Sequence, residues 1–465
     1  MGEKLLTFFK KIKLQPIAII GLSFLGVIFI GACFLALPIA HNEGTSVNFF
    51  DALFISTSCT CVTGLVSLPE GVAAAFNLFG RIVMGILIQL GGLGVTTIAV
   101  IIFMLTSRKL TFTKQSLIKE SRNLNSYKGI KRIFAEVLAV SFSFELLGSI
   151  LLFFVFYFGH HFSLDESIGY AVFHSVSAFN NAGFDLFGTT SLINFENDIA
   201  LNLIISLLII AGGLGFIVII DIITKRFKFK KFRLHTKIVL VYTLFFIVFG
   251  TLAIYLSELF NESNTSFMGA FFMSVSTRTA GFTMYDLSKY RDVSLLIMIM
   301  LMFVGASPGG TGGGVKTTTI ALLFYYIRSI VTDRDPHTFR RSLNRGLIRK
   351  ALLIILLGLL FFLIGLFIIC FCEMDYNYIK DGIKYKDYIE GASTFNALDY
   401  AFEAMSAYGT VGLSTGFTAY FSTGSKIVLI CLMYIGRLGP LTISTMFKSK
   451  NIQTYKYAEE EIAIG

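Results

Sequence analysis

Long apolar runs alternate with short polar segments along this chain of 465 residues. Eight of the runs are long enough to cross the ~30 Å hydrocarbon core of a bilayer as helices. We predict membrane spans at 16–40, 76–105, 137–158, 198–224, 238–258, 292–327, 351–373 and 425–447. The pattern therefore predicts an all-α polytopic membrane protein with eight transmembrane helices.

Four connections between these spans share one sequence pattern. A Phe is followed four positions later by Ser; five residues then precede a Gly in three copies, and four in the third. The sets are Phe54/Ser58/Gly64, Phe173/Ser177/Gly183, Phe272/Ser276/Gly281 and Phe402/Ser406/Gly412. The apolar segment before each Gly is too short to cross a bilayer. We therefore predict four re-entrant pore helices.

A second motif recurs inside the span that follows each pore helix. GGLG (91–94), GGLG (212–215), GASPGG (305–310) and GRLG (436–439) begin 24 to 29 residues after the repeated Gly. An internal repeat of this length predicts tandem structural units. We expect four span–pore helix–span repeats around a pseudo-fourfold pore. The units are 1–110 with a basic N-terminal arm, 130–228, 235–328 with a glycine-rich intramembrane loop, 349–450, and a C-terminal tail at 451–465.

Composition and charge agree with this architecture. The chain is 55% hydrophobic and 15% charged, which is too apolar for an ordinary soluble protein of this size. Of its 39 Lys and Arg residues, 29 lie in five alternate polar segments: 1–15, 106–136, 225–237, 328–350 and 448–465. By the positive-inside rule these segments, and hence both termini, are predicted to be cytoplasmic. The net charge of +10 is thus explained by membrane topology, without a nucleic-acid partner.

The extended stretch around each repeated Gly is the candidate ion-binding site. Irregular backbone at membrane depth is tolerated where it lines a watery path, and rings of carbonyls can replace the hydration shell of a cation. Glycine permits the φ angles that turn carbonyls inward. We predict a selectivity filter for K⁺ formed by Val62, Thr63, Gly64, Asn181, Ala182, Gly183, Thr279, Ala280, Gly281, Thr410, Val411 and Gly412.

The stretch GASPGGTGGGVKTTT (305–319) could be taken for a phosphate-binding loop. A P-loop needs Lys directly after Gly and a strand before the loop, whereas Val315 separates Gly314 from Lys316 and an apolar span precedes the stretch. By repeat alignment it is instead the third copy's helix break, lengthened, and it faces Arg437 of the fourth copy. We predict a gate formed by Gly305, Ser307, Pro308, Gly309, Gly310, Thr311, Gly312, Gly313, Gly314, Lys316 and Arg437.

Other charged or polar motifs are open to more than one interpretation. Arg278, just before Thr279-Ala280-Gly281, would either repel cations or brace the filter by binding carbonyls or an acid. Asp51, Asp185 and Asp399 near the outer mouth would either attract cations or be solvated surface acids. GLSTG (412–416) fits a nucleophile elbow, but no His follows it and no strand–helix alternation surrounds it. Two further classes therefore remain as alternatives: a phosphate-binding enzyme and an alternating-access carrier with broken helices.

The four-copy pattern resembles the superfamily of K⁺ transporters that includes TrkH and KtrB, whose filter glycines match Gly64, Gly183, Gly281 and Gly412. The missing extra pair of spans before the first repeat and the ending AEEEIAIG favour the KtrB branch. The resemblance implies K⁺ uptake across the bacterial plasma membrane, often dependent on Na⁺, and no enzymatic activity. It also implies a lipid-embedded homodimer with one pore per subunit and a cytosolic KtrA-type nucleotide-binding ring. Arg437 matches the gate arginine of this family.

Overall fold

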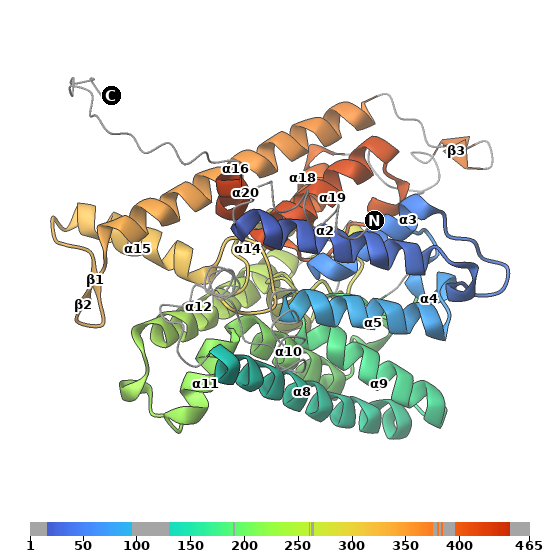
Figure 1. The fold of residues 1–465 in the computed structure, drawn as a ribbon, viewed down its shortest axis with the longest axis horizontal. Helices are drawn as coiled ribbons and strands as arrows, with labels where there is room; N and C mark the ends of the chain where they lie inside the picture. Colours follow the sequence, from blue (N-terminus) through green and yellow to red (C-terminus); the bar gives the residue numbers. More distant parts are fainter. Residues whose placement is uncertain are drawn as a thin grey trace, which may run out of the picture.

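The computed structural model describes residues 16–94, 130–188, 191–259, 261, 265–374, 379–380, 383–384 and 396–446. This part of the chain is helical apart from two short hairpins (Figure 1). The hairpins pair β1 (His337–Thr338) with β2 (Arg341–Ser342), and β3 (Ile379–Lys380) with β4 (Ile383–Lys384). The predicted all-helical membrane class is therefore confirmed. The basic N-terminal arm, most of segment 106–136 and the tail 451–465 lie outside the described residues.

Each repeat contains three principal helical elements in the predicted order. The first spans are α2 (Pro16–Leu35), α8 (Ile130–Phe154), α12 (Leu234–Glu258) and α16 (Arg345–Glu373). The short pore helices are α3 (Phe49–Cys61), α9 (Leu164–Phe179), α13 (Phe267–Ser276) and α18 (Ala397–Gly409). The second spans begin as α5 (Leu78–Leu93), α10 (Ile199–Leu214), α14 (Asp292–Phe303) and α19 (Thr423–Leu438). A short helix, α4 (Gly71–Ala75), precedes α5.

A polar side chain caps the start of every pore helix, which explains why these helices begin where they do. In α3, α9 and α13 the cap oxygen accepts a backbone N–H three residues on, and in α18 the cap and Asp399 bond each other's backbone as a capping box. The caps are Asn48, Ser163, Ser266 and Asn396. Asp51 and Asp399, expected at the outer mouth, lie in the first turns of α3 and α18. A negative charge there is stabilised by the helix dipole.

The apolar runs of the second spans are not continuous helices but are broken at the second motif, as the repeat alignment predicted for 305–319. Among the described residues, three helices are long and apolar enough to cross a membrane: Ala135–Gly159, Leu234–Glu258 and Arg345–Glu373. Ile199–Leu214 and Phe216–Thr224 (α11) form a fourth candidate, bent by 96°. The predicted spans 76–105, 198–224, 292–327 and 425–447 therefore need correction, because their helices end or break inside them.

The breaks occur within the second repeated motif. Helix α5 ends at Gly94, α10 gives way to α11 at Gly215, and α19 gives way to α20 (Pro440–Met446) at Gly439. These glycines have φ of 80°, 93° and 87°, a region that favours glycine. In the third repeat a loop, 304–316, separates α14 from α15 (Thr317–Val331). An apolar run long enough to span thus hides a backbone that turns at mid-length.

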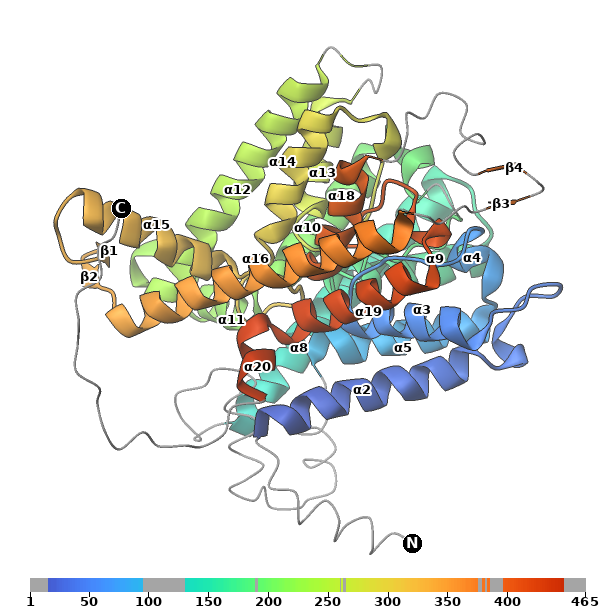
Figure 2. The ribbon, with the colours of Figure 1, turned by 90° about the horizontal axis from the view of Figure 1, so that it is seen from above.

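The repeats close into a ring. The second span of each repeat packs against the pore helix of the next: α5 on α9, α10 on α13 and α14 on α18. Helix α19 then packs on α3 and closes the circle from the fourth repeat to the first. Figure 2 shows α2, α3, α5, α19 and α16 running along one another on this side of the molecule. Each pore helix is therefore packed against its own repeat and against the second span of the preceding one.

A serine that sequence analysis missed fixes each of the first three pore helices to its own first span. The hydroxyls of Ser56, Ser175 and Ser274 donate to carbonyl oxygens of α2, α8 and α12 at 2.7, 2.6 and 2.9 Å. Each lies two residues before the repeated Ser, so the S-x-S spacing was a usable signal. A glycine on the facing span gives each hydroxyl its space: Gly31, Gly148 and Gly250.

Replacing Gly91 with Ala should destabilise the fold. A Cβ there would press on the Thr60 carbonyl oxygen and lie 2.8 Å from Val62 Cγ2, so the end of α3 must shift. We expect a loss of about 1–3 kcal/mol, as for other overpacked cores. Thermal unfolding of the purified protein in detergent measures this loss. Gly85→Ala on the same helix is the matched control, because nothing lies within 4 Å of its added Cβ; equal unfolding temperatures for the two variants would contradict the close approach.

Candidate functional site

The four repeated glycines form a closed ring. A Cβ added to Gly64 would lie 2.6 Å from the Ala182 oxygen, and one on Gly183 would lie 2.6 Å from the Ala280 oxygen. A Cβ on Gly281 would meet the Val411 oxygen, and one on Gly412 would meet the Thr63 oxygen, at still shorter range. The carbonyl before each Gly thus reaches the Gly of the neighbouring repeat. Of the twelve residues predicted to bind K⁺, eight take part in this ring.

The other four predicted filter residues share an unusual backbone. The residue two positions before each Gly is left-handed: Val62 (φ 57°), Asn181 (57°), Thr279 (75°) and Thr410 (50°). Three of these are β-branched, for which positive φ is a genuine outlier. Strain of this kind costs on the order of 1–3 kcal/mol per residue and is found at functional sites. Its recurrence at one register in four repeats shows that the fold imposes it.

The repeated Ser after each Phe holds this strained backbone in place. The carbonyls of Ser58, Ser177 and Ser406 accept the N–H of the residue before Gly at 2.8 Å, and that of Ser276 does so at 2.9 Å. The hydroxyls of Ser58 and Ser406 accept the Gly N–H at 3.0 Å. In the other two repeats the hydroxyl donates to the carbonyl of the Phe after Gly. The common Ser is therefore a brace for the glycine turn.

Side chains three positions before this Ser secure the segment beyond the turn. Leu186 N–H approaches His174 Nε2 at 3.4 Å, and the Thr283 hydroxyl approaches Met273 Sδ at 3.9 Å. In the fourth repeat the fully buried Glu403 carboxylate accepts from the Ser414 hydroxyl, the Thr415 N–H and the Thr418 hydroxyl. Ser414 of the GLSTG motif therefore bonds an acid that orders a loop.

Asp185 lies just beyond the second glycine. Burial raises the pKa of its carboxyl to about 6, and the hydrogen bond from the Phe187 N–H (3.0 Å) opposes part of that rise. The group therefore loses its charge as the pH falls through about 6. Negative charge beside the second turn is consequently weaker in acid.

The glycine-rich loop 304–316 is bound to the broken span of the second repeat. Ser307 N–H donates to the Gly213 oxygen at 3.0 Å, and Thr311 N–H donates to the Gly212 oxygen at 3.2 Å. In return, Phe216 N–H donates to the Gly309 oxygen at 3.1 Å. Groups left unpaired where α10 breaks are thus satisfied by the loop, as a buried backbone requires. The neck of the loop is closed by Gly305 N–H on the Val315 oxygen (2.9 Å).

The same loop packs directly against the left-handed residues of three repeats. The Thr311 hydroxyl lies 3.2 Å from Asn181 Oδ1, and Gly313 N–H donates to Thr410 Oγ1 at 3.0 Å. A Cβ on Gly312 would meet Thr279 Oγ1. Among the predicted gate residues, Ser307 and Thr311 are fully buried, and Pro308 contributes its carbonyl beside Gly215. The loop therefore lies against the base of the glycine ring.

Two cationic side chains hold this arrangement. Arg437 donates from Nη1 to the Thr311 oxygen and from Nη2 to the Gly91 oxygen, and so links the fourth repeat to the loop and to the first repeat. Lys316 Nζ donates to the Gly312 oxygen at 2.6 Å and to the Gly313 oxygen at 3.2 Å. The predicted gate residues are thus brought together in one network. In this geometry the arginine is occupied in binding carbonyls.

Comparison with known proteins identifies the family. The sequence profile described as TrkH, cation transport protein, matches residues 18–455. This chain belongs to the TrkH cation transport family. It is 33% identical to the potassium/sodium uptake protein NtpJ of Enterococcus hirae, over 97% of this chain and 98% of that protein. It is also 33% identical to the Ktr system potassium uptake protein B of Bacillus subtilis, over 98% of each chain.

The solved structures support the same fold. The potassium transporter TrkH of Vibrio parahaemolyticus superposes with a TM-score of 0.69 at 19% identity, covering 94% of this chain and 86% of the other. The TrkH-family assignment also excludes the enzyme alternative, since the matching proteins are transporters. Neither the phosphate-loop nor the nucleophile-elbow interpretation therefore stands.

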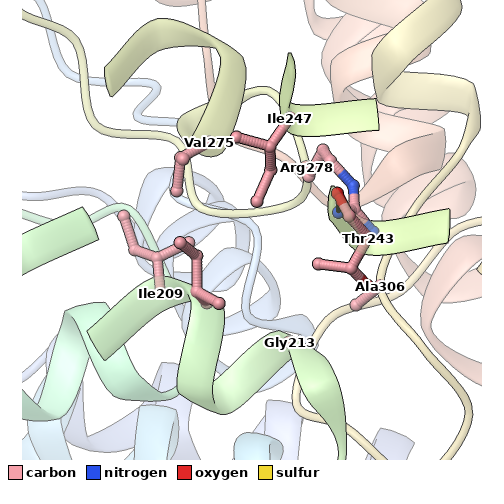
Figure 3. Close-up of a pocket in the computed structure, with 8 residues that line it drawn as sticks. Ile209, Gly213, Thr243, Ile247, Val275, Arg278 and Ala306 are labelled. Carbon is pink, nitrogen blue, oxygen red and sulfur yellow. Dashed lines mark hydrogen bonds between the residues drawn. The ribbon is translucent and has the colours of Figure 1, made fainter. Parts of the chain in front are cut away.

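In this TrkH-family member, Arg278 has the bracing position considered from sequence. Its Nη1 donates to the Thr243 oxygen of α12 at 3.3 Å, its guanidinium lies 5.8 Å from the Phe246 ring centroid, and Nε has no partner in the described part of the chain. Figure 3 shows Arg278 and Thr243 beside Ala306 and Gly213 around a small pocket. The residue contacts a span, and so supports the third turn from behind.

The glycine-rich loop 304–316 should become more mobile when Arg437 is replaced by Gln. The two charge-assisted hydrogen bonds of Arg437 are lost, because the shorter, neutral Gln side chain can make at most one of them. Each such bond is worth about 1.5–3 kcal/mol. We expect backbone amides of residues 305–316 to exchange hydrogen about tenfold faster or more, by mass spectrometry in detergent. Lys426→Gln is the control: Lys426 bonds the Ser67 oxygen and pairs with Asp51 far from the loop. Unchanged loop exchange in Arg437→Gln would contradict the role of Arg437 in holding the loop in place.

Proposed function

We propose that this chain is the pore subunit of a potassium uptake system in the bacterial plasma membrane. The observation that carries the proposal is the ring in which four glycines each meet a carbonyl of the next repeat. Such carbonyl oxygens replace the water molecules around a cation as it dehydrates, and they do so without a charged side chain. The names of NtpJ and of Ktr protein B, which mention potassium uptake, support the choice of ion.

The proposed topology has eight spans, with both termini in the cytoplasm and a pseudo-fourfold pore along the ring axis. Broken second spans count as one crossing each. Cations enter from outside, dehydrate at the glycine ring and pass the loop on the cytoplasmic side. The membrane potential supplies the driving force, about 2.3 kcal/mol per charge per 100 mV.

The gate is the network of loop 305–316 and Arg437. It lies against the base of the ring, so an ion leaving the ring meets a packed loop and a guanidinium. The conformation described here is therefore a closed one. Opening requires the loop to release α10 and the arginine together.

The proposed assembly is a homodimer with a cytosolic KtrA-type nucleotide-binding ring, and Na⁺ is the proposed coupling or activating ion. The words "Ktr system" in the names of two relatives support a partner. The exposed segment 334–345, which includes the hairpin β1–β2 and the first residue of α16, carries Arg334, Arg340, Arg341 and Arg345, a basic face that suits such a ring, although Arg345 also pairs with Asp335.

An alternating-access carrier is the second candidate. The 96° bend between α10 and α11 is the observation that favours it, because broken helices are typical of carriers. Carriers usually contain two repeats, whereas four closed repeats suit a single axial pore. Ion currents through single reconstituted molecules would favour the pore, and strictly coupled exchange would favour the carrier.

Gly281→Ser should impair K⁺ recognition. The new side chain would strain a φ of 83° and push on the Val411 oxygen, which disturbs the ring. We expect the K⁺ concentration for half-maximal uptake to rise about tenfold or more, equivalent to about 1.4 kcal/mol. Complementation of a K⁺-uptake-deficient bacterium, with and without a KtrA-type partner and Na⁺, and ⁸⁶Rb⁺ uptake measure this.

Gly169→Ser on pore helix α9 is the matched control, since nothing lies within 4 Å of its added Cβ. It should transport like the parent. Unaltered K⁺ and Na⁺ affinities in Gly281→Ser would remove the filter assignment.

Deleting Gly309–Gly314 should increase ion flux through the pore. The deletion removes the residues that lie against Thr279 and Thr410 and the carbonyl that Arg437 binds. Flux of ⁸⁶Rb⁺ into liposomes should exceed that of the parent several-fold, while choline stays excluded. Flux at or below the parental level, in protein that remains folded, would count against gating by this loop.

A further inference from the structure

A buried acid lies between the first and second repeats and bonds Asn180, which precedes the second turn of the glycine ring. Glu145, in the span α8, is 5% exposed. Its Oε1 accepts from the Ser141 hydroxyl at 2.9 Å, and its Oε2 accepts from Gln89 Nε2 at 3.2 Å. Nowhere in the described residues does a Lys, Arg or His form an ion pair with it. A carboxylate at this depth is costly unless a cation or a proton neutralises it.

Three oxygens, one of them from this acid, converge on the amide nitrogen of Asn180. Asn180 Nδ2 lies 2.9 Å from Gln89 Oε1, 3.1 Å from Glu145 Oε1 and 2.9 Å from the Val176 carbonyl oxygen. An amide nitrogen has only two hydrogens, so it satisfies at most two of these acceptors well. The site therefore has one more oxygen than the amide can serve.

The other end of the same amide is unsatisfied. Asn180 is fully buried, and its Oδ1 has no hydrogen-bond partner among the described groups. Oδ1 points toward α5 at Gly92, three residues from Gln89, where a Cβ would collide with it. A half-turn of the amide would exchange Nδ2 and Oδ1 and bring a fourth oxygen to the convergence point. Four oxygens there repel one another unless a cation lies between them.

We propose that this cluster is a binding site for one alkali-metal cation, with Glu145, Gln89, Asn180 and the Val176 carbonyl as ligands. One carboxylate charge among neutral oxygens matches a monovalent ion. A divalent ion would leave one positive charge uncompensated in a buried place. The cation supplies the countercharge that Glu145 lacks, and the half-turn of Asn180 supplies its missing partner.

The third repeat has a fixed cation at the equivalent place. Ser175 and Ser274 bond the carbonyls of Glu145 and Ile247, which aligns these two residues. Counted back from the repeated Gly, Asn180 and Arg278 both lie three positions before it, and Arg278 lines the pocket in Figure 3. There the acid is replaced by isoleucine and the amide by a guanidinium. A positive charge, the Arg278 guanidinium, is thus accommodated behind the third turn. In the second repeat, the corresponding charge would be a cation bound from solution.

The site adjoins the glycine ring through Asn180. This residue directly precedes Asn181, whose left-handed backbone and side chain contact Thr311 of the loop. Cation binding would therefore order the second turn. This consequence for transport rests on the proposed function, whereas binding itself does not.

Thermal unfolding of the purified full chain tests the site. We compare NaCl, KCl and choline chloride at equal ionic strength, in the Gly281→Ser background so that ions at the ring contribute less. Na⁺ or K⁺ should raise the unfolding temperature in a saturable way, on the order of 2–4 °C. Glu145→Gln should abolish this rise. Ser149→Ala, which loses only a bond to the Glu145 backbone carbonyl, should retain it.

Asn180→Arg is a second, independent variant. It places the third repeat's guanidinium beside Glu145, so it should unfold at a higher temperature in choline and no longer respond to Na⁺ or K⁺. This variant decides the question if Glu145→Gln does not fold. A full cation response in either variant overturns the proposal, as does stabilisation of the parent by acid alone, which would show a bound proton. Failure of the parent chain to take up K⁺, with cation binding at Glu145 intact, would count against the proposed function and leave this site standing.

Discussion

The close approach of each repeated glycine to a carbonyl of the next repeat is the constraint on which the structure depends. A single Cβ at any of the four positions would push a neighbouring carbonyl, so the ring closes only with glycine. Closure in turn requires the left-handed residue two positions earlier and the bracing Ser behind it. The pore helices, their caps and the cyclic packing of second spans all serve to hold these turns at one axis.

Much of this site was predictable because its signals are local and repeated. The Phe–Ser–Gly spacing and the GGLG echo are visible within short windows, and four copies in register make chance agreement improbable. The place of Arg437 opposite the loop also followed from repeat alignment. The left-handed backbone at Val62 and Thr410 could not be predicted, because these β-branched residues have the opposite intrinsic preference.

Two features escaped sequence reasoning for physical reasons. Repeat alignment pointed to a helix break in this motif, but apolar runs measure hydrophobicity and not backbone continuity, so the φ of 93° and 87° at Gly215 and Gly439 could not be read from them. The cluster around Glu145 joins residues 35, 56 and 91 positions apart, and its meeting depends on how α5, α8 and the second turn pack. An acid within an apolar run was a signal that something was there, but not what it touched.

The bonding of the loop to the break after α10 has a consequence for the proposed gate. Three backbone bonds join them, and each is worth about 1 kcal/mol net. Because the bonds satisfy buried groups on both sides, partial release leaves polar backbone stranded, so they should break together. If the loop is the gate, as proposed, these three bonds give it a threshold. A small force would then leave the proposed gate closed, whereas a partner that binds only the released form would shift the whole population.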